Sequence, residues 1–471
     1  MQILLSKSRL SRKFLSVIVA FTVVIGGYVV YRSHASGTDF VTRSGQQLLL
    51  NGQPYRILGF NMYRANVSFA MPNDTNYLLN NGTSLNDSLV AINANGGKKD
   101  VFRAWFIQQE VTPTTSGYNW APFDKTLQVA QANGYKVIAT LADQWNYEGP
   151  PYKDLTWYQG GYKTAAYNGT LNGVSYNENV PYYQYVHDVV ARYANNPTIA
   201  AWEMVNEAED SPDPSSCPAN AEAVMQSFAQ TVGDEIRGLD PNHLISLGNA
   251  GNGNCGALDS DYQTLMSIPE LDLCSFHDYE GATNASAFNS ANGLNVRVQQ
   301  CAAVNKPIYV GEVGINLYDS AVNGSEQTRA NLLDNKLSAQ FGLQGVVGFI
   351  PWQYDNRVPP DYPCCSTDYS YGQTDPALAV MDNYALATPT PTSTPTATPS
   401  PTPTPTTSPS PTATPTPVPL VGDLNGDGHV NIFDLSILLS AWGTSSATAD
   451  LNHDGTVNIF DLSVLLSHWT G

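Results

Sequence analysis

Eight short apolar runs, separated by stretches with helical spacing, constrain the fold of residues 36–386 more than any other feature. The candidate strands are YRILGF (55–60), DVFRAWF (100–106), YKVIATLA (135–142), TIAAWEMVN (198–206), HLISLG (243–248), LDLCSFH (271–277), PIYVGE (307–312) and GVVGFIPW (345–352). Residues 182–194 and 221–238 carry apolar side chains at helical spacing. Strands that alternate with helices predict an α/β fold, a parallel (β/α)8 TIM barrel. An open doubly wound sheet is the alternative, and the lack of a Gly-rich phosphate loop after the first strand disfavours it.

Composition divides the chain into four parts. Residues 387–420 are almost purely Pro, Thr, Ser and Ala, which cannot form a core and favour extended polyproline conformations. This segment predicts a stiff linker. We therefore expect a leader in residues 1–35, the barrel domain in 36–386, the linker in 387–420 and a small all-α module in 421–471.

The N-terminal segment has the layout of a secretory signal. Basic residues at 7, 9, 12 and 13 precede an apolar run over 14–31, and a small-x-small site follows at 33–35. The apolar run is long for a signal, so a retained membrane anchor is the alternative. Either alternative exports the rest of the chain, which predicts a secreted protein, or one attached to the cell surface if the anchor is retained.

Six cysteines are consistent with an oxidising compartment. Cys217 and Cys255 both lie in predicted loops, and Cys274 and Cys301 flank one strand–helix unit, so we predict these two disulfides. The adjacent Cys364 and Cys365 are left unassigned.

The charge balance restricts the partners. With 22 basic and 41 acidic residues the formal net charge is −19, which disfavours nucleic acid and anionic membranes. A neutral polymer fits better, and the 26 Tyr and 8 Trp residues offer rings that can stack on sugars, although most of them are expected in packing.

Residues 421–471 contain an internal repeat that predicts two calcium sites. Each copy opens with D-x-N-x-D-G and continues as a 12-residue loop, which supplies oxygen ligands from positions 1, 3, 5, 7, 9 and 12. The expected ligands of the first ion are Asp423, Asn425, Asp427, the His429 carbonyl, Asn431 and Asp434. Those of the second are Asp450, Asn452, Asp454, the Thr456 carbonyl, Asn458 and Asp461.

The repeat has one apolar helix after each loop and no entering helix, so the module resembles a type I dockerin. The resemblance implies calcium-dependent binding to a cohesin module on a scaffold protein. Both copies contain the same Asn-Ile-Phe-Asp-Leu-Ser segment, so the binding surface should have near-twofold symmetry and permit two orientations.

Two glutamates end apolar strand runs in the barrel region. Glu207 closes TIAAWEMVNE and Glu312 closes PIYVGE, at the fourth and seventh strands. Because active sites of such barrels lie at the C-terminal strand ends, the two carboxyl groups are expected to face one another. A pair roughly 5 Å apart hydrolyses a glycosidic bond with retention, one residue as nucleophile and the other as acid and base.

Polar and aromatic residues near the other strand ends support this site. Arg103 would be a cation inside a strand, tolerable beside an anion such as Glu312. The residues expected to bind substrate or orient the carboxylates are Arg103, Trp105, Trp145, Asn206, His277, Tyr279 and Trp352.

At these positions the sequence resembles family 5 glycoside hydrolases. The segments that carry the resemblance are FRAWF, NPTIAAWEMVNE, DPNHLISLG, HDY, KPIYVGE and GFIPW. The resemblance implies that Glu207 is the acid/base and that Asn206 corresponds to the asparagine that precedes it in the family. It also implies that Glu312 is the nucleophile, with Arg103 and Tyr279 as its hydrogen-bond partners.

The substrate indicated by the resemblance is β-1,4-mannan. The stretch TLADQWNYEGP (140–150) lacks the His found there in many cellulases and is similar to the corresponding mannanase turn, which makes Asp143, Gln144 and Trp145 candidate substrate contacts. The long Tyr-rich loop 146–177, with Trp157, is expected to wall the cleft. A cellulase, another β-glucanase or a β-glycosidase of the same family is the first alternative, and a non-catalytic carbohydrate-binding or adhesion protein is the second.

Overall fold

The structure is a computed structural model. It describes residues 39–66, 85–94, 96–112, 117–145, 152–171, 174–211, 216–280, 290–355, 368–386, 421–425, 429–446 and 448–469. The predicted leader, the predicted linker, Cys364, Cys365 and Asp427 lie outside these residues. The chain forms two compact units, which divide between residues 391 and 392, and each is described by itself. None of the helices described is long and apolar enough to cross a membrane.

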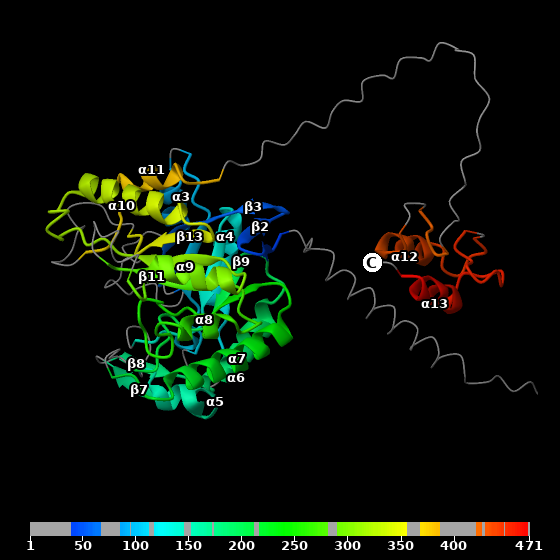
Figure 1. Cartoon of the computed structure of the whole chain (residues 1–471), viewed down its shortest axis with the longest axis horizontal. Helices are drawn as coiled ribbons and strands as arrows, with labels where there is room; N and C mark the ends of the chain where they lie inside the picture. The colour runs from blue at the N-terminus through cyan, green and yellow to red at the C-terminus, as the bar shows by residue number, and fades with distance from the viewer. Residues whose placement is uncertain are drawn as a thin grey trace, which may run out of the picture. The chain divides into compact units, whose positions relative to one another are not determined.

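Eight parallel strands form the barrel of the first unit (Figure 1). They are β4 (Ile57–Asn61), β5 (Val101–Trp105), β6 (Lys136–Thr140), β9 (Ile199–Glu203), β10 (Leu244–Ser246), β11 (Cys274–Asp278), β12 (Ile308–Val313) and β13 (Val346–Pro351). Hydrogen bonds join them in the order β10-β9-β6-β5-β4-β13-β12-β11. A parallel bridge between Ser246 and Leu273 connects the two ends of this sheet, so the (β/α)8 TIM barrel predicted from the sequence is confirmed.

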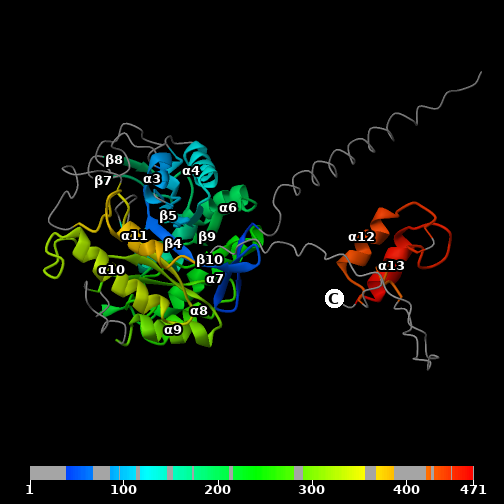
Figure 2. The same cartoon turned by 90° about the horizontal axis from the view of Figure 1, so that it is seen from above.

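A helix follows each barrel strand, and together the helices surround the strands (Figure 2). They are α3 (Leu85–Ile92), α4 (Ala121–Ala132), α6 (Tyr182–Tyr193), α7 (Ala221–Leu239), α8 (Asp261–Met266), α9 (Leu294–Ala303), α10 (Glu326–Phe341) and α11 (Ala377–Asp382). The helical spacing of apolar residues in α6 places them on one face of the helix. Tyr185, Val186, Val189 and Val190 are therefore all buried against the barrel.

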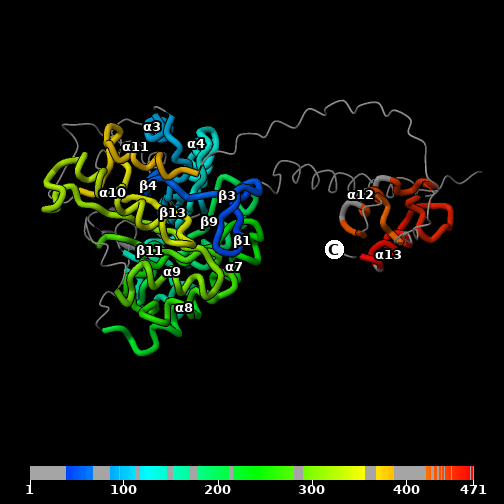
Figure 3. The backbone as a smooth tube through the Cα atoms, turned by 45° about the horizontal axis from the view of Figure 1, so that its top comes forward, coloured from blue at the N-terminus to red at the C-terminus, as the bar shows by residue number. Residues whose placement is uncertain are grey.

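A small antiparallel sheet covers the end of the barrel at which the strands begin. It consists of β1 (Val41–Ser44), β2 (Gln47–Leu50) and β3 (Gln53–Tyr55), the blue segment in Figure 3. Val41, Leu48 and Tyr55 from this sheet pack with Val101 and Leu244 from the barrel strands in one apolar cluster. The opposite end, where the strands finish, is therefore the end available for a functional site.

The long connection from β6 to α6 contains its own elements. These are η2 (Trp157–Gly161), α5 (Tyr162–Thr164) and the antiparallel hairpin of β7 (Asn168–Leu171) and β8 (Val174–Asn177). The ring of Trp157 packs against Tyr158, Tyr162, Tyr182 and Phe228. Trp157 thus fixes this connection to α6 and α7, and its side chain remains partly exposed.

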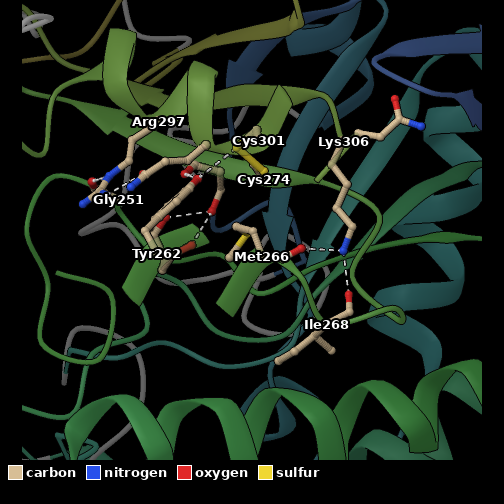
Figure 4. Close-up of a disulfide and its surroundings, with 12 residues drawn as sticks. Gly251, Tyr262, Met266, Ile268, Cys274, Arg297, Cys301 and Lys306 are labelled. Carbon is tan, nitrogen blue, oxygen red and sulfur yellow. Dashed lines mark hydrogen bonds between the residues drawn. A yellow bond between two sulfur atoms is a disulfide. The ribbon is translucent and has the colours of Figure 1, made fainter. Parts of the chain in front are cut away.

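Both predicted disulfides are present. Cys217 pairs with Cys255, and Cys274 at the start of β11 pairs with Cys301 in α9. Figure 4 shows the second bond, with the Lys306 ammonium group nearby donating hydrogen bonds of 2.6 Å to the carbonyls of Met266 and Ile268. These contacts tie the connection between α9 and β12 to the end of α8 and the residues that follow it.

The second unit contains the two helices expected from the repeat, α12 (Ile432–Ser440) and α13 (Ile459–Ser467). Its core is small and consists of Val430, Leu438, Ala449, Val457 and Leu465. A core of this size stabilises a fold weakly, so binding of metal ions is expected to contribute much of the stability of this unit.

Candidate active site

Glu207 and Glu312 meet at the carboxyl end of the barrel, as predicted. Glu312 lies in β12 and Glu207 lies four residues beyond the end of β9. One oxygen of each carboxylate and one ring nitrogen of His277 all lie within 4.8 Å of one another. Retaining glycosidases hold their carboxyl groups roughly 5 Å apart, whereas inverting enzymes hold them roughly 6.5–9.5 Å apart. The geometry therefore fits double displacement.

The backbone at Glu207 has an unusual conformation. Its φ of 55° lies in the left-handed region, which non-glycine residues rarely adopt and which clusters at functional sites. The Glu207 amide donates to the Gly248 carbonyl at 2.8 Å. A Cβ atom at Gly248 would collide with the Val205 carbonyl and the Glu203 side chain, so the close approach of the β9 and β10 ends requires glycine.

Glu312 receives two strong donors. Nη1 of Arg103 donates to Oε1 at 2.9 Å, and the Tyr279 hydroxyl donates to Oε2 at 2.6 Å. Burial raises the pKa of Glu312, while the charges of His277 and Arg103 and the Tyr279 hydroxyl act in the opposite direction. Donors aimed at both oxygens fix the orientation of the carboxylate, as a nucleophile requires.

Glu207 has different partners. The His277 ring nitrogen Nδ1 lies 2.8 Å from Oε1, and the Trp145 indole donates to Oε2 at 2.6 Å. Burial opposes ionisation, yet these hydrogen bonds hold the pKa of Glu207 below its usual value. For His277, burial favours the neutral ring, but the charges of Glu312 and Glu207 raise its pKa above the ordinary value. Because the three groups act on one another's pKa, their protonation states are coupled.

Arg103 is fully buried and pairs with two acids rather than one. Besides Glu312 it contacts Glu203, whose Oε1 lies 2.9 Å from Nε and 2.5 Å from Nη2. Thr140 and Tyr309 donate to the same carboxylate. Sequence reasoning missed Glu203. This acid lies within the apolar run TIAAWEMVN (198–206), four residues before Glu207.

Asn206 is held from both sides. Its Oδ1 accepts from Nη2 of Arg103 at 2.6 Å, and its Nδ2 donates to Asp143 at 2.9 Å. Burial raises the pKa of Asp143 to about 7. Gln144 is fully buried and bonds to Tyr158 and to the Lys153 carbonyl. In this structure both side chains are buried and bonded to protein groups, where they position Asn206 and the β6 loop.

Aromatic rings lie on two sides of the acid pair. Trp352, directly after β13, stacks on Tyr63 with ring centroids 5.1 Å apart, and Trp105 packs against both rings. Trp105 is only 2% exposed, so it is better placed to support the ring of Trp352 than to contact a sugar directly. On the other side, Trp145 packs against Tyr152. Sequence reasoning missed Tyr63, which follows β4 and carried no motif.

The calcium-loop residues that the structure describes are arranged alike in the two repeats. Asp434 accepts from the amides of Leu424 and Asn431 at 2.7 and 2.9 Å. Asp461 accepts from the amides of Asn452 and Asn458 at 3.0 and 2.8 Å. Each twelfth-position Asp thus fastens the beginning of its loop to the start of the following helix, which brings the proposed oxygen ligands together. Gly455 has a φ of 94°, as the sharp turn at the sixth position requires.

Comparison with known families decides the classification of the barrel. The family model for cellulase (glycosyl hydrolase family 5) matches residues 57–343, more than half of the chain. The chain belongs to glycosyl hydrolase family 5. A model for the dockerin type I domain matches residues 421–468, so this family 5 chain also carries a dockerin domain.

The family 5 chain is similar to fungal enzymes. It is 27% identical over 269 residues to mannan endo-1,4-beta-mannosidase A of Podospora anserina, a match that covers 54% of this chain and 65%, just under two thirds, of the fungal one. It is 23% identical over 371 residues to the protein of the same name from Aspergillus aculeatus, with coverage of 72% and 85%.

Solved structures of the family have the same fold. The glycoside hydrolase family 5 mannosidase from Rhizomucor miehei superposes with a TM-score of 0.52 at 16% identity, covering 74% of this chain and 97% of the other. The endo-beta-1,4-mannanase from Thermotoga petrophila gives 0.51 at 18% identity, covering 71% and 77%. At these identities the likeness establishes the barrel fold alone.

Proposed function

We propose that the barrel of this family 5 chain is a retaining endo-β-1,4-mannanase with Glu312 as nucleophile and Glu207 as acid and base. The observation that carries the proposal is the approach of their carboxylate oxygens to within 4.8 Å. The donors around each acid support the division of roles, because Arg103 and Tyr279 fix Glu312 from both oxygens.

The proposed reaction has two steps. An oxygen of Glu312 attacks the anomeric carbon while Glu207 gives its proton to the departing glycosidic oxygen, which breaks the bond and leaves a glycosyl ester on Glu312. Glu207, now ionised, then takes a proton from a water molecule, whose oxygen displaces Glu312 and restores the original anomeric configuration. The hydrogen bonds from His277 and Trp145 stabilise the ionised form of Glu207 that the second step needs.

Mannan is proposed as the substrate because the similar fungal proteins are named mannan endo-1,4-beta-mannosidases. A panel of mannan, glucomannan, cellulose, other β-glucans and β-galactan, with analysis of the products, tests this choice. We expect mannan to be cleaved fastest, with viscosity falling well before reducing ends accumulate, as internal cleavage requires. Faster cleavage of cellulose or of another β-glucan would contradict the substrate, and binding without cleavage at any pH would contradict the chemistry.

Replacement of Glu207 by alanine should affect substrates according to their leaving group. On mannan, we expect kcat to fall by roughly 10²–10⁴-fold, since a sugar alkoxide departs slowly without a proton. A dinitrophenyl mannoside needs little protonation, so formation of the glycosyl-enzyme should remain near the wild-type rate, measured as a burst of phenolate.

Glu270→Gln is a matched control for this experiment, because Glu270 accepts a hydrogen bond from Gln230 of α7 and has no contact with the acid pair. It should leave both rates unchanged. If Glu207→Ala lowered the rate by the same factor on both substrates, Glu207 would not be the acid.

For the dockerin domain we propose two bound calcium ions and a cohesin-bearing scaffold as partner, in an extracellular setting. The proposed ligands are the loop oxygens named from the repeat, of which those of the second loop all lie within described residues. Exposed apolar side chains at equivalent repeat positions, Leu439 and Trp442 in one copy and Leu466 and Trp469 in the other, support a partner surface with two equivalent halves.

Removal of calcium should unfold the dockerin domain. Because its apolar core is small, we expect chelation to make residues 421–469 sensitive to protease while the barrel remains as a resistant fragment, followed by mass spectrometry of the digest. Calcium should restore resistance, and Asp461→Ala, which cuts the tie between loop and helix, should prevent full restoration. Equal resistance with and without chelator would contradict the proposal.

A further inference from the structure

We propose that Glu209, Asp210 and Asn254 bind one calcium ion at the carboxyl end of the barrel, directly beyond the proposed acid/base Glu207. This site is separate from the dockerin loops. It concerns the loop that follows β9 and the loop that follows β10, which lie next to one another because their strands are paired.

The first argument is the number of buried oxygens without a partner. Glu209, Asp210 and Asn254 are 4%, 2% and 8% exposed. Nδ2 of Asn254 donates to Oε2 of Glu209 at 2.8 Å, which occupies one atom of each side chain. Of the remaining oxygens, Oδ1 of Asn254 and both oxygens of Asp210 have no hydrogen-bond partner in another described residue, and Oε1 of Glu209 has only the Tyr152 hydroxyl nearby. Buried polar atoms are almost always satisfied, so three unpartnered oxygens on neighbouring loops, beside a second carboxylate, indicate a missing ligand.

The second argument is the lack of a compensating charge. Within the described part of the chain, neither Glu209 nor Asp210 forms an ion pair with a lysine, arginine or histidine. The charges of Glu207 and Asp210 both act on Glu209, and both repel it. Buried carboxylates are costly unless a counter-charge neutralises them, and a divalent cation neutralises two at once.

The chemistry of the donors identifies the class of cation. The unpartnered atoms are carboxylate and amide oxygens, with no sulfur and no imidazole among them. Such a set suits a hard cation, and calcium accepts bidentate carboxylates and irregular geometry, with water completing its six to eight ligands. Zinc and copper, which prefer nitrogen and sulfur, fit poorly.

The two loops are already fastened to one another. The Cys217–Cys255 disulfide joins them next to Asn254. The fully buried Arg297 donates to the carbonyl of Gly251 at 2.6 Å and to that of Ala257 at 3.1 Å, and Figure 4 shows Arg297 directed at Gly251. An ion would therefore enter a site whose ligands are held in place, which lowers the entropic cost of binding. Its expected effect is to fix the segment on which Glu207 adopts its left-handed backbone.

The test compares the calcium content of the full chain and of Glu209→Gln/Asp210→Asn, measured by equilibrium dialysis in neutral buffer. Both proteins keep the dockerin loops, so the difference reports on the barrel alone. We expect the variant to bind one calcium ion fewer per chain. Asp87→Asn/Asp234→Asn, which removes two exposed acids elsewhere on the barrel, should bind as much as wild type.

Thermal unfolding of the barrel supplies the second readout. Calcium should raise the wild-type midpoint by several degrees and leave the midpoint of Glu209→Gln/Asp210→Asn unchanged. Equal calcium content in the two proteins would overturn the proposal. Neither readout involves polysaccharide. The calcium site can therefore fail its test while the proposed hydrolase activity stands, and the hydrolase activity can fail its own test while the calcium site stands.

Discussion

Glu312→Ala is expected to abolish mannan hydrolysis, with kcat at least about a thousandfold below wild type. The loss should be this large because no other described carboxylate can form the glycosyl ester, since Glu203 is fully buried beneath Arg103 and Glu207 is engaged by His277 and Trp145. The measurement is release of reducing sugar, with thermal unfolding recorded to establish that the variant is folded.

A small external nucleophile makes the Glu312 experiment sharper. Azide has room to occupy the place of the removed side chain, and with a dinitrophenyl mannoside it should give a mannosyl azide of inverted configuration, detectable by NMR. Glu270→Gln serves again as the unaffected control. Wild-type turnover by Glu312→Ala would refute the role of Glu312, and an azide product of retained configuration would refute the direction of attack.

Arg103→Met is expected to be the most destabilising single substitution in the barrel interior. It leaves Glu203 and Glu312 buried without their shared cation, and removal of one partner from a buried ion pair costs about 3–5 kcal/mol. Activity should also fall, because Glu312 loses the donor to Oε1. Chemical denaturation of the barrel measures the first effect and mannan hydrolysis the second.

The chain provides a matched control for Arg103. Arg192 pairs with Asp124 at 2.7 Å, but both side chains are well exposed, so Arg192→Met should cost less than about 1 kcal/mol. In the double variant Arg103→Met/Glu203→Gln, stability should return in part because one uncompensated charge is gone, whereas activity should not return. Similar losses of stability for Arg103→Met and Arg192→Met would contradict the account of the buried triad.

Most of the fold could be predicted because the barrel strands are short apolar runs with clear ends. All eight expected strands overlap β4, β5, β6, β9, β10, β11, β12 and β13, and the helical spacing in 182–194 and 221–238 located α6 and α7. The sheet of β1 to β3 was missed, since its strands have three or four residues and each places only one or two apolar side chains against the barrel. Segments this short carry too few alternating positions to identify a strand.

The candidate site was predictable where a charge interrupted an apolar strand. Glu207, Glu312 and Arg103 were found in this way, and the structure brings them together. Glu203 was not identified because its role depends on the register between β6 and β9, which places it beside Thr140 and in contact with Arg103. Asp143 and Gln144 mark the limit of this reasoning, because a polar residue just past a strand can be directed into the protein or toward a ligand, and spacing does not distinguish the two.

The burial of Arg103 together with Glu203 and Glu312 has a consequence for how the barrel should respond to salt concentration. Dissolved ions screen the attraction between charges that are exposed to water, with a screening length of about 10 Å in 0.1 M salt. Charges buried away from water are screened much less. Arg103 and Glu203 are sealed from water entirely, and Glu312 nearly so. The attraction between Arg103 and its two acids is thus set by the protein interior. A salt concentration high enough to screen the ion pairs of the outer surface should therefore leave Glu312 held in place.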